Sequence, residues 1–127
     1  MLIVRFGVVP ARYLPGPLGP PLGGPVDAVL ALVGYTFLHG GWLHLAVNSI
    51  WLLALGSGVA RRLGAARVLL FYFVCGVLAA LVYIVAQAGS LAPAIGASGA
   101  VSGLLGGVIR FAVAHPGPGG RHGLVSL

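Results

Sequence analysis

Two long stretches of this chain carry no charged side chain, and they limit the folds open to it. One lies between Asp27 and Arg61, and the other runs from residue 68 to residue 109. The hydrocarbon core of a bilayer is about 30 Å thick, so a helix needs about 20 consecutive apolar residues to cross it. Both stretches can supply such helices. In lipid the backbone hydrogen bonds must be made within the protein, and a helix makes them along an uninterrupted apolar segment. We therefore predict an all-α membrane protein.

The composition also favours lipid over water as the solvent of this chain. Of its 127 residues, 59% are hydrophobic and only 6% are charged, whereas a soluble domain has about 25% charged residues. The formal net charge of +6 could suggest nucleic acid, but all seven cations are arginines in loops or at the edges of apolar segments. They form no basic stripe with interleaved aromatic residues. Nucleic acid is therefore excluded as a partner, and the lipid bilayer is expected as one.

Glycine and proline divide the uncharged stretches into helices. The segment from Gly34 to Gly41 interrupts the first stretch, and Gly-Ser-Leu-Ala-Pro at 89–93 splits the second, which is too long for one helix. These breaks predict a polytopic helical bundle of about three transmembrane helices plus a membrane-dipping segment. The predicted transmembrane helices are residues 42–60, 67–88 and 97–114, and the membrane-dipping helix is residues 26–38.

Three regions follow from this division. Residues 1–25 are expected to form a loop or head segment, because proline and glycine alternate from residue 15 to residue 25 and prevent a continuous helix. Residues 26–115 form the membrane domain. Residues 116–127 are expected to be a disordered tail.

Arginines at the helix ends predict the orientation of the membrane domain. Arg61, Arg62 and Arg67 lie between the first two predicted spans, and Arg110 lies near the end of the third. The positive-inside rule places these residues on the cytoplasmic face of an integral, multi-pass protein, for which we expect a bacterial plasma membrane. Arg5 and Arg12 fall outside by the same counting, against the rule. Tyr35 and Trp42 are expected to be interfacial anchors.

Polar residues inside the apolar stretches are the candidates for chemistry, because an unpartnered polar group in hydrocarbon costs a few kcal/mol. His44 and Asn48 are one helical turn apart, so both side chains can point into one cavity and donate hydrogen bonds to the same oxygen. Alternatively, the pair only joins two helices. His39 precedes this helix and is expected to order the loop rather than to react.

Ser98 is the candidate nucleophile. It lies in a Gly-Ala-Ser-Gly elbow between Gly96 and Gly99, at the predicted start of a helix whose first amides lack intrahelical partners. The alternative is that Ser98 only caps this helix. Gly99, Gly103 and Gly107 follow at four-residue spacing, which allows another helix to pack closely against this one.

Four segments in this order resemble the rhomboid family of intramembrane serine proteases: FGVVPAR, FLHGGWLHLAVN, the ARRLG loop and GASGAVSGLLG. The resemblance implies that Ser98 is the nucleophile. It implies that His44 and Asn48, with the Ser98 backbone amide, form an oxyanion hole. The expected reaction is acyl transfer to Ser98 followed by hydrolysis of transmembrane protein substrates, and neither a metal nor another cofactor is implied.

The resemblance also identifies what the chain lacks. Rhomboid proteases use a histidine in an Ala-His-x-x-Gly setting on a later helix as catalytic base, and this motif does not occur here. His115 lies 17 residues after Ser98, roughly 25 Å away along a helix, and His122 follows a Pro/Gly segment. The family core has six spans. Residues 26–115 are therefore expected to be a partial rhomboid domain, and the chain an internal or truncated portion of a rhomboid protein. The helices that it lacks are then expected among its partners.

Two other functions stay open at this point. The chain could be a catalytically dead rhomboid-like protein that binds membrane clients. It could instead be a small membrane subunit whose glycine-rich helix packs in a larger assembly.

Because the catalytic base is missing, we predict that purified residues 1–127 do not cleave a transmembrane substrate by themselves. The measurement is cleavage of a labelled transmembrane substrate in reconstituted vesicles. Cleavage that Ser98→Ala abolishes would contradict this prediction.

Overall fold

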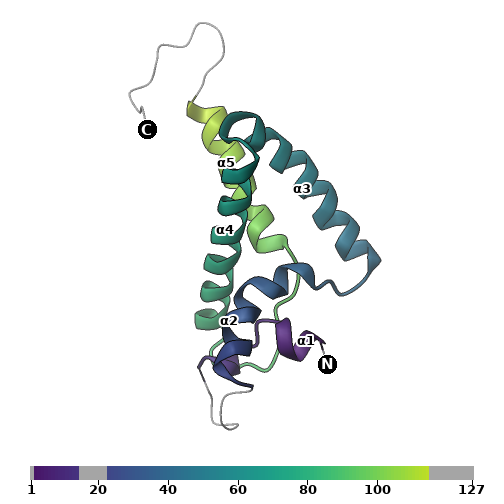
Figure 1. Ribbon diagram of the computed structural model, residues 1–127, viewed down its shortest axis with the longest axis vertical. Coiled ribbons are helices and arrows are strands. Elements are labelled where there is room, and N and C mark those ends of the chain that lie inside the picture. The colour runs from purple at the N-terminus through teal and green to yellow at the C-terminus, as the bar shows by residue number, and fades with distance from the viewer. Residues whose placement is uncertain (1, 15–22, 115–127) are drawn as a thin grey trace, which may run out of the picture.

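The computed structural model describes residues 2–14 and 23–114, and all regular elements in these ranges are helical (Figure 1). The expected all-α fold is therefore confirmed. The helices are α1 (Leu2–Phe6), η1 (Pro10–Arg12), α2 (Pro25–Gly34), η2 (Tyr35–Phe37), α3 (Trp42–Leu63), α4 (Ala65–Ala86) and α5 (Ser98–Ala114), where η marks a 3₁₀ helix.

The predicted helices fall on observed ones. Residues 42–60 and 67–88 correspond to α3 and α4, each of 22 residues and each long and apolar enough to cross a membrane. Residues 97–114 correspond to α5, whose 17 residues extend about 25 Å at 1.5 Å per residue. Residues 26–38 correspond to α2 followed by η2. A third crossing by α5 stays a prediction.

Helix α4 is the central element of the bundle. It contacts α2, α3, α5 and η1, and its buried residues recur at every fourth position, which aligns them along one face. Its other faces carry exposed leucines and valines, as expected for a helix that meets lipid. The buried residues of α4 are Val68, Tyr72, Gly76, Ala80 and Ile84.

Helix α5 packs against α4 through its glycines. A Cβ atom added at Gly103 would overlap the Cys75 sulfur, and one added at Gly99 would lie 2.5 Å from the Ala79 Cβ. Gly107 faces the ring of Phe71. The neighbour that the glycine spacing predicts is therefore α4 of the same chain, and the two backbones approach closely because these side chains are absent.

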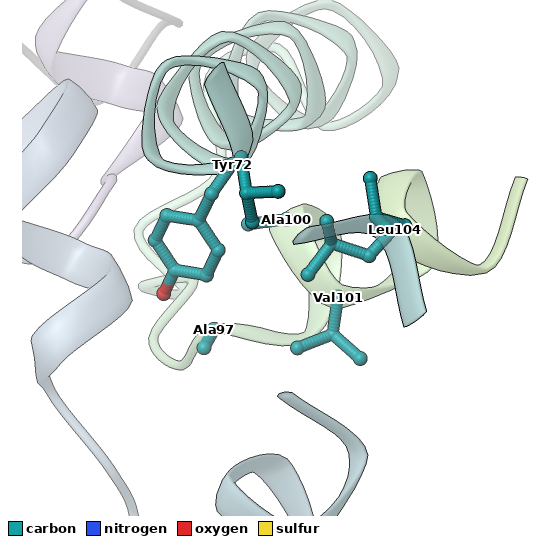
Figure 2. Packing of buried hydrophobic residues seen from close by; sticks show 7 residues of the cluster. Tyr72, Ala97, Ala100, Val101 and Leu104 are labelled. Carbon is teal, nitrogen blue, oxygen red and sulfur yellow. The ribbon is translucent and has the colours of Figure 1, made fainter. Parts of the chain in front are cut away.

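The core between α3, α4 and α5 lies directly beside the start of α5. Figure 2 shows Tyr72 of α4 beside Ala97 and Ala100, with Val101 and Leu104 farther along α5. Ala97 is buried, Leu104 is fully buried, and Val59 of α3 and Val68 of α4 complete the cluster. This packing holds the first turn of α5 in place, one residue after Ala97.

The head segment packs at the end of the bundle opposite the α3–α4 turn (Figure 1). Val8 and Ala94 exchange two backbone hydrogen bonds, of 3.1 and 2.8 Å. The Arg12 guanidinium is buried and donates to backbone carbonyls, including that of Arg5, and Arg5 forms an ion pair with Asp27 at 3.0 Å. The two arginines that the predicted orientation sets against the positive-inside rule thus bind groups of the head and of α2.

Some predicted features lie outside the described residues. These are most of the proline-glycine stretch, namely residues 15–22, and also His115, His122 and the tail 116–127.

We predict that Gly103→Ala destabilises the protein by about 1–3 kcal/mol, because the added methyl group meets the Cys75 side chain at van der Waals overlap. Gly106→Ala is the matched control on the same helix, since nothing lies within 4 Å of its added Cβ. The control should be neutral or slightly stabilising, because alanine favours the helix. The measurement is the unfolding midpoint in detergent. Equal midpoints for the two variants would contradict close α4–α5 packing at Gly103.

Candidate active site

Ser98 is the first residue of α5, and its side chain is exposed. The Ala97 carbonyl accepts a hydrogen bond from the Val101 amide at 2.9 Å, which is the first bond of the helix. Ala97 therefore occupies the N-cap position, and Ser98 lies one residue inside it. The amides of the first helical turn, including that of Ser98, have no intrahelical acceptor. A hydroxyl at this position is accessible and lies beside unpaired donors.

The elbow before Ser98 turns at Gly96, which has a φ of +106°. This left-handed region favours glycine, because a side chain there would be strained. The Gly96 amide donates to the Tyr35 carbonyl at 2.8 Å. Gly96 is thus held by the turn that follows α2.

His44 and Asn48 lie against this elbow from α3. A Cβ atom added at Gly96 would be 2.7 Å from the His44 Cε1 and Nε2 atoms and 3.7 Å from the Asn48 amide nitrogen. His44 is half-buried and Asn48 is buried. The structure therefore brings both side chains that the sequence selected to the residue two positions before Ser98.

Hydrogen bonds define which atoms of this pair can donate. The Gly40 amide donates to His44 Nδ1 at 3.2 Å, so in the neutral ring Nδ1 is the acceptor and Nε2 carries the proton. That Nε2 atom is the one beside Gly96. The Asn48 amide donates one hydrogen to the His44 carbonyl at 3.0 Å, which leaves its second hydrogen available. Two N–H donors can therefore converge on an oxygen bound at the elbow.

His39 contacts His44 from the loop before α3. Its ring lies edge-on to that of His44, with ring centroids 5.1 Å apart and an interplanar angle of 71°. Its Nδ1 atom is 3.3 Å from the Phe37 carbonyl. His39 is therefore part of the loop packing around His44.

The prediction that Tyr35 is an interfacial anchor is wrong. Its side chain is only 4% exposed, and its hydroxyl donates to the Gly76 carbonyl of α4 at 2.7 Å. The reason for the error is that the hydrogen-bond partner lies 41 residues later in the chain, where no local pattern points to it. Trp42, in contrast, is 87% exposed, as an anchor would be.

The described residues contain no group of three or more His, Cys, Asp or Glu side chains that could hold a metal ion. The donors at the elbow are an imidazole, an amide and backbone N–H groups. Such donors suit an oxygen that becomes negative during acyl transfer.

Sequence comparisons assign the family of this chain. The Rhomboid domain family matches residues 27–117, and the chain therefore belongs to the rhomboid family. It is 35% identical over 78 residues to RHOMBOID-like protein 5 of Arabidopsis thaliana, a match that covers 61% of this chain and 25% of the relative. It is 37% identical over 78 residues to Rhomboid protease GluP of Bacillus subtilis, covering 61% of this chain and 15% of the relative.

The chain therefore spans only about a quarter or less of the length of these curated relatives. Rhomboid-like protease 5 of Toxoplasma gondii is 34% identical over 85 residues, which cover 62% of this chain and 9% of the relative. No solved structure matches the chain significantly. Family membership, together with helices α3 and α4, identifies a membrane protein of a family that includes proteases.

We predict that Gly96→Ala lowers stability more than Gly64→Ala does. Both glycines have a positive φ, of +106° and +85°. Alanine is strained in this region, so both variants should lose about 1–3 kcal/mol of unfolding free energy. Only the Gly96 variant also places a methyl group 2.7 Å from His44, whereas nothing lies within 4 Å of a Cβ at Gly64. The measurement is the unfolding midpoint of each variant in detergent. An equal loss in both would contradict contact between His44 and the elbow.

Proposed function

We propose that this chain carries the nucleophile and the oxyanion hole of an intramembrane serine endopeptidase that cleaves transmembrane proteins. The observation that carries the proposal is the close approach of His44 and Asn48 to Gly96, which starts the elbow leading to Ser98. Membership of a family that includes named proteases supports the reaction class. The proposal also includes transmembrane proteins as substrates, a bacterial plasma membrane as the location, and about three transmembrane helices in this chain.

In the proposed mechanism the Ser98 hydroxyl attacks a peptide carbonyl. A bond forms between the serine oxygen and the carbonyl carbon, and the carbonyl oxygen becomes negative. His44 Nε2–H, the Asn48 amide and the Ser98 backbone amide stabilise this oxyanion, because they are preorganised donors at the elbow. The carbon–nitrogen bond of the peptide then breaks, the leaving amine takes the proton, and water hydrolyses the acyl-enzyme.

The proton of Ser98 needs an acceptor in this scheme. His44 accepts a hydrogen bond at Nδ1 and faces the elbow with Nε2–H, so it serves as a donor rather than as the base. The resemblance implies that the base is a histidine of a further helix, which packs against the bundle described here. The proposed reaction therefore requires residues 1–127 together with the helix that supplies this base, and this combination is what we call the complete gene product.

We predict that a fluorophosphonate probe labels Ser98 in the complete gene product and that Ser98→Ala abolishes the labelling. His44→Ala and Asn48→Ala should each slow labelling by about 10²–10³-fold, because each removes one oxyanion donor. Ser57→Ala is the matched control, since Ser57 is an exposed serine on α3 whose hydroxyl donates to the Ala54 carbonyl. The control should be labelled at the unchanged rate.

The measurement is the rate of covalent labelling in membranes. A complete gene product that folds and remains unlabelled would overturn the protease proposal and would favour a catalytically dead rhomboid-like protein that binds membrane clients. Labelling that does not depend on His44 and Asn48, together with altered assembly in those variants, would favour a membrane subunit of a larger complex.

A further inference from the structure

The position of Ser98 depends on its neighbours, because its own side chain is exposed at the surface of the bundle. Gly96 lies two residues before Ser98, and Gly99 directly follows it. One residue, Tyr35, lies beside the chain at both of these positions. Its carbonyl accepts the Gly96 N–H, and its hydroxyl lies where a side chain at position 99 would meet it.

The first contact is made by the Tyr35 backbone. Its carbonyl accepts the Gly96 N–H at 2.8 Å, which ties the elbow to the turn after α2. Gly96 has a φ of +106°, a conformation that glycine adopts readily because it has no side chain. A Cβ atom at Gly96 would also meet the His44 imidazole. The Tyr35 carbonyl therefore fixes how the elbow faces the two side-chain donors.

The second contact is made by the Tyr35 hydroxyl. It donates to the Gly76 carbonyl of α4 at 2.7 Å, and a Cβ atom added at Gly99 would lie 3.2 Å from the hydroxyl oxygen. The phenol thus occupies the space between α4 and the first turn of α5. The ring is held in a second buried cluster with Val8, Ala80 and Ile84.

We propose that Tyr35 is a positioning residue that holds the Ser98 elbow in register with His44 and Asn48. Its hydroxyl fixes the ring against α4 and Gly99, and the fixed ring in turn holds the backbone carbonyl that binds Gly96. The consequence for reactivity rests on the proposed function, whereas the effect on the elbow itself does not. The residue acts through the elbow and does not touch the reacting atoms.

The variant Tyr35→Phe tests this role without removing the core. It keeps the ring and the backbone carbonyl and deletes only the hydroxyl. The Gly76 carbonyl lies inside α4 and keeps its intrahelical bond, so the fold should persist.

Two tyrosines provide matched controls. The Tyr83 hydroxyl donates to the Ala92 carbonyl at 3.1 Å, and the Tyr13 hydroxyl donates to the Ala28 carbonyl at 2.6 Å. Each control loses the same kind of bond as Tyr35→Phe. Unlike Tyr35, neither control tyrosine binds the elbow through its backbone carbonyl.

The first measurement is amide hydrogen exchange in the reconstituted protein. We expect Tyr35→Phe to speed exchange at the Gly96 amide and in the first turn of α5 by about tenfold or more, because the bond to the Tyr35 carbonyl opens more often. Tyr83→Phe and Tyr13→Phe should leave these amides unchanged. Equal exchange at the elbow in all three variants would overturn the proposal, whether or not the protein is a protease.

The second measurement is the kinetics of fluorophosphonate labelling of the complete gene product. We expect Tyr35→Phe to lower the maximal labelling rate about tenfold while the half-saturating probe concentration stays the same, because misplacement of a nucleophile slows reaction more than binding. The two control variants should differ less than twofold from the unsubstituted protein. Faster exchange at the elbow without labelling of any variant would keep the positioning role and overturn the protease proposal. A labelling rate in Tyr35→Phe equal to that of the controls would overturn the catalytic consequence of the positioning role.

Discussion

The close approach of α5 to α4 is the constraint on which the rest of the structure depends. Lipid tails are as apolar as leucine, so helix association in a bilayer relies on van der Waals packing rather than on the hydrophobic effect. Gly99 and Gly103 provide that packing, because their missing side chains leave room for Ala79 and Cys75. The first turn of α5 is thereby held against the middle of the bundle, and the position of Ser98 follows from this contact.

The need to pair buried polar groups explains why the turn after α2 and the elbow before α5 lie together. The Gly96 amide cannot bond within α5, and it finds the Tyr35 carbonyl of the turn after α2. The Tyr35 hydroxyl then finds the Gly76 carbonyl of α4. An unpaired polar group would cost about 1–3 kcal/mol when buried. The same bonds that satisfy this requirement also connect α2, α4 and the elbow, so the structural need and the proposed chemical role coincide.

Local patterns predicted much of the fold. The uncharged stretches and their glycine breaks placed α3, α4 and α5 within a few residues of the observed helix ends, and the membrane-dipping helix corresponds to α2 with η2. The four-residue spacing of His44 and Asn48 placed both on one face of α3. These features depend on neighbours within a turn or two, where periodicity and backbone preference act.

Contacts between distant segments could not be predicted in this way. Tyr35 has the side chain and the sequence position expected of an interfacial anchor. It is nevertheless buried, because its hydrogen-bond partner lies on another helix. The amino-acid order by itself determined the helices, the membrane class and the chemical groups that converge on the elbow. Only the tertiary structure decided that Gly96 meets His44 and that Tyr35 lies beside both Gly96 and Gly99, because such neighbours depend on how closely the helices pack and not on any local sequence period.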